Sequence, residues 1–224
     1  MTDRITFERE GDVAVISLDD GKVNAMGFEM LEAINLALDR AEAETSAVAL
    51  FGREGILSGG FDLKVINGGD EGELRRMVNL GVRTLMRLYG FPLPLVAGAT
   101  GHAIALGAFI LLASDYRIGI EGDFKLGLNE TAIGLTLPAF GIELAQARLS
   151  PRHLSQAAIG ARLYLPAEAI EAGFLDEVVE PGRIREAVVA RAQAMAALDA
   201  NAFNATKQAF RGPAIGRVIG ALPT

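Results

Sequence analysis

The sequence predicts a single α/β domain in which strands and helices alternate along the chain. Apolar runs of strand length are followed by segments whose apolar residues recur at helical spacing. With 224 residues, half of them hydrophobic, the chain can bury one sizeable core. No internal repeat, low-complexity stretch or linker divides the chain.

The N-terminal quarter of the chain has clear strand and helix patterns. Residues 5–9 alternate apolar and polar side chains and 13–18 form an apolar run, so both are expected to be strands. Gly11-Asp12 between them is typical of a hairpin turn. Residues 28–43 place their apolar side chains on one helical face, and 47–51 have the composition of a buried strand.

The middle of the chain continues the alternation of helix and strand. Residues 72–89 carry a helical apolar stripe, which ends at the two prolines of segment 91–94. A short strand is expected at 95–99. Residues 104–113 are apolar on all sides, which predicts a buried helix, and 116–120 form the next expected strand.

Beyond residue 137, prolines mark the expected helix starts. Pro138 suits the first turn of a helix that ends near residue 149, and Ser150-Pro151 precedes another that ends near 159. The remaining expected elements are a short helix after Pro166, a strand at 178–179, and helices at 183–198 and 200–211.

Composition and charge exclude several classes of function. The net charge is −7, and an acidic chain without a basic run is a poor nucleic-acid binder. Cysteine is absent, which excludes disulfides and thiolate chemistry, and the two histidines, His102 and His153, argue against a histidine-rich metal site. Neither a signal peptide nor a transmembrane run is present. We therefore expect a cytoplasmic protein with no membrane or nucleic-acid partner.

The motifs of several common enzyme classes are also absent. The chain has no G-x-x-x-x-G-K-[ST], no G-x-G-x-x-G after a strand, no H-E-x-x-H and no G-x-S-x-G. Their absence argues against nucleotide hydrolases, Rossmann dehydrogenases, zinc proteases and serine-type thioesterases.

Two glycine-bearing turns that follow expected strands have the features of an anion site. In the first, Gly59 and Gly60 expose backbone N–H groups because no Cβ stands in the way, and Asp62 can cap the next helix. The second, residues 98–107, enters the buried helix, whose first N–H groups lack intrahelical acceptors. One N–H from each turn would form a two-donor oxyanion hole. Two ordinary strand-to-helix turns are the alternative interpretation.

Glu130 lies in the mostly apolar segment 124–135. Burial of its carboxylate would raise the pKa, and a raised pKa suits a general base near neutrality. A surface glutamate in a loop, or a charge at a helix N-terminus, is the alternative.

Taken together, these segments resemble the crotonase superfamily of enoyl-CoA hydratases and isomerases. The resemblance runs from about residue 5 to about residue 210, and the matching stretches are 21–26, 58–63, 94–107 and 115–118. It implies a crotonase-type spiral of ββα units in residues 1–198, with a short C-terminal helical segment in 199–224.

The resemblance also implies a ligand and roles for individual residues. The substrate is an acyl-CoA thioester, no other cofactor and no metal is needed, and the subunits form a homotrimer or hexamer. The N–H groups of Gly59 and Leu106 hold the thioester carbonyl, and Glu130 is the catalytic base. The residues expected to contact the substrate are Val23, Ala25, Gly60, Phe61, Asp62 and Phe109.

One departure from the family pattern bears on the reaction. Hydratases of the family carry two glutamates, and Phe109 stands at the position of the first, whereas the second is kept as Glu130. A single carboxylate can move a proton from C2 to C4, so we predict a Δ3-Δ2-enoyl-CoA isomerase of fatty-acid β-oxidation. Two alternatives stay open: a hydratase with a single catalytic glutamate, and a non-catalytic acyl-CoA-binding protein.

Other positions modify these expectations. Leu106 stands where many relatives have glycine, and the chain ends soon after the helix expected at 200–211, which predicts a short C-terminal cover. Candidates for binding the coenzyme phosphates are Lys22, Lys64 and Arg53. Residues that fit the family pattern and are expected to be structural are Asp62, Asp115 and Arg117.

Overall fold

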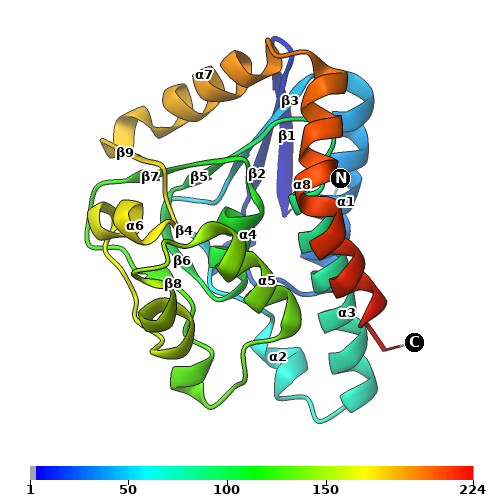
Figure 1. The fold of residues 1–224 in the computed structure, drawn as a ribbon, viewed down its shortest axis with the longest axis vertical. Helices are drawn as coiled ribbons and strands as arrows, with labels where there is room; N and C mark the ends of the chain where they lie inside the picture. The colour runs from blue at the N-terminus through cyan, green and yellow to red at the C-terminus, as the bar shows by residue number, and fades with distance from the viewer. Residues whose placement is uncertain (1–3, 224) are drawn as a thin grey trace.

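A six-stranded sheet forms the centre of the molecule in the computed structural model, which describes residues 4–223 (Figure 1). The order is β1-β2-β3-β5-β7-β9, with β1 antiparallel to β2 and all other neighbours parallel. The expected hairpin is confirmed, and Gly11 at its turn has a φ of 61°. The strand bounds are Ile5–Glu10 (β1), Val13–Leu18 (β2), Ala47–Phe51 (β3), Leu95–Ala99 (β5), Tyr116–Ile120 (β7) and Glu177–Val179 (β9).

Helices cover both faces of this sheet, which explains why its central strands are apolar throughout. On one face, α7 (Ile184–Ala196) packs Val188 and Ala192 against alternate residues of β2 and β3. On the other face, α1 (Phe28–Glu44), α3 (Glu71–Tyr89) and α4 (Leu106–Ala113) enclose the larger core. The helix that is apolar on all sides, α4, is fully buried, as expected.

A second sheet of three short parallel strands lies beside the first. Its order is β4 (Gly55–Ser58), β6 (Gly101–Ile104) and β8 (Leu126–Gly127). The sequence patterns predicted no strand in these three segments, and the helix predicted at 104–113 begins two residues before α4. Each follows a strand of the large sheet and precedes helical structure, so the repeating unit is ββα. The predicted spiral of ββα units is confirmed.

Gly101 occupies the tightest backbone contact between two successive ββα units. An added Cβ would lie 2.0 Å from the carbonyl oxygen of Gly55, and the φ of Gly101 is +158°. Because neither backbone segment can yield, we expect Gly101→Ala to lower the free energy of unfolding by about 2–4 kcal/mol. Chemical denaturation measures this, with Gly182→Ala as the control, since a Cβ at Gly182 meets no atom within 4 Å. Equal stability of the two variants would contradict the prediction.

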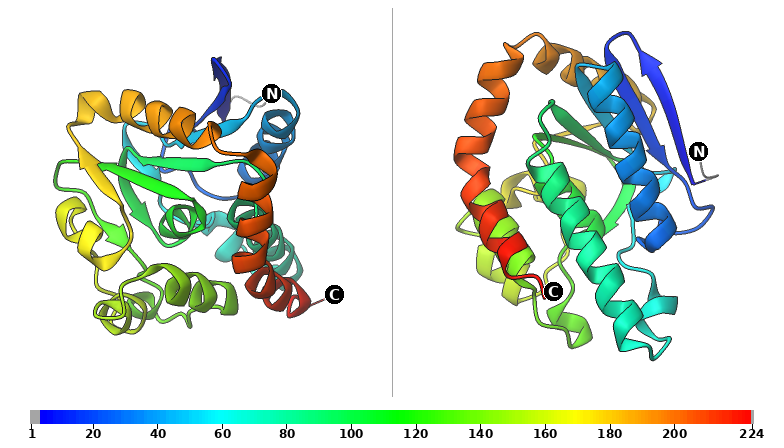
Figure 2. Two further views of the ribbon diagram at one scale, coloured as in Figure 1. Left: turned by 45° about the horizontal axis from the view of Figure 1, so that its top comes forward. Right: turned by 90° about the vertical axis from the view of Figure 1, so that its right-hand side faces the viewer.

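The C-terminal helix is longer than expected. Helix α8 (Ala200–Gly220) continues through Pro213 to Gly220, whereas the sequence predicted an end near residue 211. It runs along one side of the molecule beside α3 (Figure 2). A Cβ at Gly90, which ends α3, would lie only 2.7 Å from Ile215 of α8. The division at residue 198 into two regions stays a prediction.

Shorter helical elements complete the fold. The helix expected at 150–159 is a turn followed by a π-helix, Ser155–Ile159, and Pro138 is the N-cap of α5 rather than its first residue. The other bounds are Leu63–Ile66 (α2), Thr131–Ile133 (η1), Ala139–Arg148 (α5), Pro166–Ala172 (α6) and Pro181–Arg183 (η3).

Candidate active site

The three predicted site segments follow the ends of the three strands of the small sheet. Residue Ser58 of β4 pairs with Ala103 of β6, and Ile104 of β6 pairs with Gly127 of β8. Because the strands are parallel, their carboxyl ends meet at one edge. The turns that carry Gly59, Leu106 and Glu130 therefore leave the sheet from the same edge.

The turn after β4 corrects one prediction. The N–H of Gly59 donates to the carbonyl oxygen of Val23 at 2.9 Å, so it is not free to serve as an oxyanion donor. The N–H of Gly60 donates to Ser58 Oγ at 3.2 Å. The first N–H of this turn without an acceptor in the described part of the chain is that of Phe61.

The turn after β6 holds Leu106 at the first position of α4. Its predecessor, Ala105, has a φ of 52°, donates its N–H to Gly127 O at 3.1 Å and accepts from Phe109 N at 3.0 Å. An N–H at the start of a helix has no intrahelical acceptor, so that of Leu106 can donate a hydrogen bond to a ligand. A Cβ at Gly60 would lie 3.9 Å from Leu106 N, which shows that the two turns are in contact.

Glu130 is buried, as the apolar segment predicted. Only 9% of the residue is exposed, and its Oε2 has no hydrogen-bond partner among the described residues. Burial raises the pKa of the carboxyl above its usual range, and nearby backbone N–H groups of Asn129 and Glu130 oppose the shift more weakly. The carboxylate thus has the basicity of a proton acceptor.

Phe109 stands at the position where hydratases of the family are expected to carry their first glutamate. Its ring is 1% exposed and makes an edge contact with Phe140, with ring centroids 5.0 Å apart. The ring also fits against Gly141, where a Cβ would lie 2.7 Å from Phe109 Cζ. Phe109 lies one turn of α4 beyond Leu106, so this side of the helix is apolar.

A cavity of about 590 Å3 adjoins the turn after β4. It is lined by five of the residues predicted to contact the substrate, namely Val23, Ala25, Gly60, Phe61 and Asp62. Gly59 also lines it, whereas Leu106, Phe109 and Glu130 do not. The cavity thus extends from the turn after β4 toward the loop of Val23 and Ala25. The other three predicted site residues are not part of its lining.

Basic side chains lie around this cavity. Lys22 and Lys64 line it, and neither makes an ion pair within residues 4–223. Arg4 also lines it but is paired with Glu29. Arg53 is not part of the lining and is held by Asp19 and the Lys22 carbonyl. Of the three basic candidates, the structure therefore favours the two lysines.

The residues expected to be structural have structural contacts. Asp62 caps α2 by accepting from Lys64 N at 2.8 Å. Arg117 makes a two-point ion pair with Asp176 and donates to the carbonyl of Gly173. Asp115 is buried with two basic side chains of α8, Lys207 and Arg211.

Comparison with known proteins agrees with this arrangement. The family model for enoyl-CoA hydratase/isomerase matches residues 8–218. The chain belongs to the enoyl-CoA hydratase/isomerase family, and the predicted crotonase superfamily membership is confirmed.

Particular relatives carry names for both reactions. A solved enoyl-CoA hydratase/isomerase family protein from Pseudomonas syringae is 38% identical, with a TM-score of 0.95 over 98% of this chain and 95% of that one. Human mitochondrial enoyl-CoA delta isomerase 1 is 26% identical over 92% of this chain and 70% of that protein. A putative enoyl-CoA hydratase from Thermus thermophilus is 31% identical over 89% of this chain and 80% of that protein.

Between residues 4 and 223, no helix combines the length and the apolar character needed to cross a lipid bilayer. The same residues include no group of three or more side chains suited to holding a metal ion.

Proposed function

We propose that the protein is a Δ3-Δ2-enoyl-CoA isomerase in which Glu130 is the only catalytic carboxylate. Two observations together carry the proposal: Glu130 is buried, with no hydrogen-bond partner for its Oε2 among residues 4–223, and a phenyl ring stands at Phe109. One carboxylate suffices to remove a proton from C2 and return it at C4. Addition of water requires both a base and an acid placed around one water molecule.

The proposed reaction proceeds through an enolate. Glu130 takes the C2 proton, the electrons of that C–H bond move toward the thioester oxygen, and the resulting acid gives the proton to C4 as the double bond moves from C3–C4 to C2–C3. We assign the oxyanion donors to the N–H groups of Phe61 and Leu106. Each such donor is typically worth a factor of about 10²–10³ in rate.

Binding of coenzyme A is assigned to the cavity of about 590 Å3. Lys22 and Lys64 line it without ion-pair partners and would attract the coenzyme phosphates. Coenzyme A enters as part of the substrate, and we propose that no other cofactor is used. A place in fatty-acid oxidation, a cytoplasmic location and a trimeric or hexameric assembly are parts of the same proposal.

A hydratase is the second candidate, since the Thermus thermophilus relative carries that name. A paired assay on purified protein separates the two. One arm offers a Δ3-enoyl-CoA and follows the appearance of the conjugated Δ2 product, and the other offers the Δ2-enoyl-CoA and follows loss of conjugation by hydration. Activity in the first arm alone supports the isomerase. Activity in the second alone shows that water is activated beside Phe109 and overturns the proposal, and silence in both with retained acyl-CoA binding indicates a non-catalytic protein.

The raised pKa of Glu130 predicts an acid limb in the pH profile. Activity requires the carboxylate, so kcat/KM should fall as pH decreases through the raised pKa, at a higher pH than the value of about 4.3 for a solvated glutamate. The same shift means that the folded state holds this proton more tightly than the unfolded state. Glu130 therefore lowers the free energy of unfolding as pH rises through that window. Initial rates between about pH 4 and pH 8 test this, and a limb at or below the ordinary glutamate value would contradict it.

A further inference from the structure

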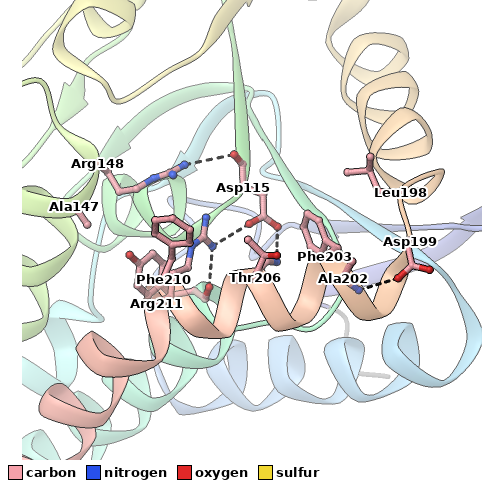
Figure 3. A pocket seen from close by; sticks show the side chains of 12 residues that line it. Asp115, Ala147, Arg148, Leu198, Asp199, Ala202, Phe203, Thr206, Phe210 and Arg211 are labelled. Carbon is pink, nitrogen blue, oxygen red and sulfur yellow. Dashed lines mark hydrogen bonds and ion pairs between the residues drawn. The ribbon is translucent and has the colours of Figure 1, made fainter.

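A second cavity, of about 630 Å3, lies near the C-terminal end of α4, whereas Leu106 of the proposed active site begins this helix (Figure 3). Its lining comes from the face of α8, the end of α5 and the residues where α3 and α4 end. It shares no lining residue with the cavity assigned to coenzyme A. Volumes of about 300–1,000 Å3 are usual for sites that bind small organic molecules.

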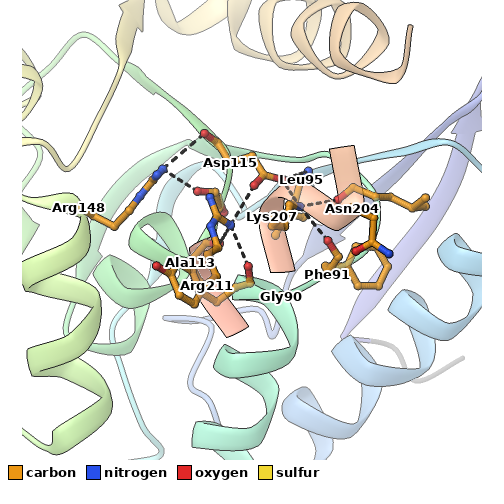
Figure 4. Close-up of polar contacts among 12 residues, drawn as sticks. Gly90, Phe91, Leu95, Ala113, Asp115, Arg148, Asn204, Lys207 and Arg211 are labelled. Atoms are coloured by element: carbon orange, nitrogen blue, oxygen red, sulfur yellow. Dashed lines mark hydrogen bonds and ion pairs between the residues drawn. The ribbon is translucent and has the colours of Figure 1, made fainter. Parts of the chain in front are cut away.

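Positive charge predominates at one end of this cavity. Three basic side chains line this end: Lys207 and Arg211 contact the carboxylate of Asp115, and Arg148 donates to the carbonyls of Ser114 and Asp115 (Figure 4). The other acid in the lining, Asp199, lies at the opposite end, where it caps α8 (Figure 3). Burial lowers the pKa of Lys207 to about 8, Asp115 opposes this shift, and the two arginines add a smaller lowering. At this end of the lining, three basic side chains thus face one carboxylate.

Arg148 and Arg211 have N–H groups that make no hydrogen bond within residues 4–223, whereas Lys207 uses all of its N–H groups. Lys207 Nζ donates to the carbonyls of Phe91 and Leu93 and to Asp115, which uses its three protons. The hydrogen bonds of Arg148 all leave from Nη2, and those of Arg211 all leave from Nη1. Arg148 Nε also lacks a partner in the described part of the chain, but it is buried out of reach of a ligand. A second carboxylate could accept from the remaining Nη groups, Arg148 Nη1 and Arg211 Nη2.

Apolar side chains form much of the remaining cavity wall. Phe210 and Leu198 belong to the lining although 84% and 54% of them are exposed, and Phe203 lies on α8 between these two positions in the sequence. Figure 3 shows Phe203 and Phe210 on the face of α8 that borders the cavity, with Leu198 just before the helix. An inorganic anion would leave this apolar surface uncovered, and a neutral lipid would leave the arginine donors unused.

We propose that this cavity is a second ligand site, which binds a medium-chain fatty carboxylate. The carboxylate accepts from the free donors of Arg148 and Arg211, and the alkyl chain packs against Phe203, Phe210 and Leu198. The site is separate from that of the acyl-CoA, so a free acid can occupy it while the proposed reaction takes place elsewhere.

Isothermal titration calorimetry with decanoate tests the proposal. Decanoate should bind, whereas decanol and inorganic phosphate should bind at least about tenfold more weakly. Decanol lacks the carboxylate, and phosphate lacks the alkyl chain. Excess coenzyme A should not compete. Phe210→Asp places a negative charge at the exposed mouth with little effect on folding and should weaken binding by about tenfold or more. Leu36→Asp, at another exposed apolar position, on α1, is the control and should bind normally.

A second variant addresses the charged end of the site. Arg148→Gln should also weaken decanoate binding, provided that circular dichroism shows a folded protein. Decanoate binding that survives both Phe210→Asp and Arg148→Gln would overturn the proposal. Competition by coenzyme A would place decanoate in the acyl-CoA site and would also overturn it. Absence of decanoate binding would also overturn the proposal. This includes the case in which a second copy of the chain covers this face, which sedimentation would reveal as a dimer or larger assembly.

Discussion

Glu130→Gln is expected to lower kcat for isomerisation by about 10²–10⁴, the range typical of a lost general base. Glutamine keeps the shape of the side chain but cannot accept the C2 proton. The residue contributes nothing to the lining of the cavity assigned to coenzyme A, so the affinity for acyl-CoA should change little. Steady-state kinetics give kcat, and equilibrium titration with the substrate gives the dissociation constant.

The matched control is Glu121→Gln, which changes an exposed glutamate at the end of β7 and should leave kcat unaltered. The buried Oε2 of Glu130 has no partner to lose, so Glu130→Gln should fold normally. An active Glu130→Gln enzyme would remove Glu130 from the mechanism, whereas an unchanged kcat with a raised KM would make it a binding residue.

Asp115→Ala is expected to lower the free energy of unfolding by about 3–5 kcal/mol. The side chains of Asp115 and Lys207 are 6% and 4% exposed, with 2.6 Å between Oδ2 and Nζ, and Arg211 lies 2.9 Å from Oδ1. The Asp115 carboxylate also accepts from Leu95 N at 2.8 Å, which ties the start of β5 to α8. Removal of the carboxylate leaves two buried cations without their counterion (Figure 4).

Asp39→Ala supplies the comparison for this measurement. Asp39 forms an equally short ion pair with Arg87, but its side chain is 63% exposed, so its loss should cost about 1 kcal/mol or less. Urea denaturation of both variants tests the difference. A cost for Asp115→Ala as small as that for Asp39→Ala would show that α8 is held mainly by its apolar contacts.

Most of the elements that sequence patterns predicted are buried on one side or completely over at least five residues. All six strands of the large sheet were expected: runs such as Ala47–Phe51 are fully buried, whereas the half-buried β9 has only three residues. The strands of the small sheet are two to four residues long and include Gly55, Gly101 and Gly127. Such segments have no measurable periodicity, and only the pairing of distant residues makes them strands.

The candidate site also has features that the sequence predicted and one that it did not. Burial of Glu130 followed from the apolar residues around it, and the loop of Val23 and Ala25 was found through the family resemblance. The assignment of Gly59 was wrong because the acceptor of its N–H, Val23 O, belongs to a loop distant in sequence. A local motif shows which N–H groups glycine leaves accessible, but it does not show which of them the fold has already used.

The backbone conformation of Ala105 affects the stability of the fold. A non-glycine residue in this backbone conformation is strained by about 1–3 kcal/mol, and its methyl group lies 3.2 Å from the Cβ position that Gly60 leaves empty. The strained backbone of one turn thus fits the bare backbone of the other, and this fixes the direction of the Leu106 N–H. In the proposed reaction this N–H would be a donor that does not need to reorganise, and the strain of Ala105 would be its cost in stability.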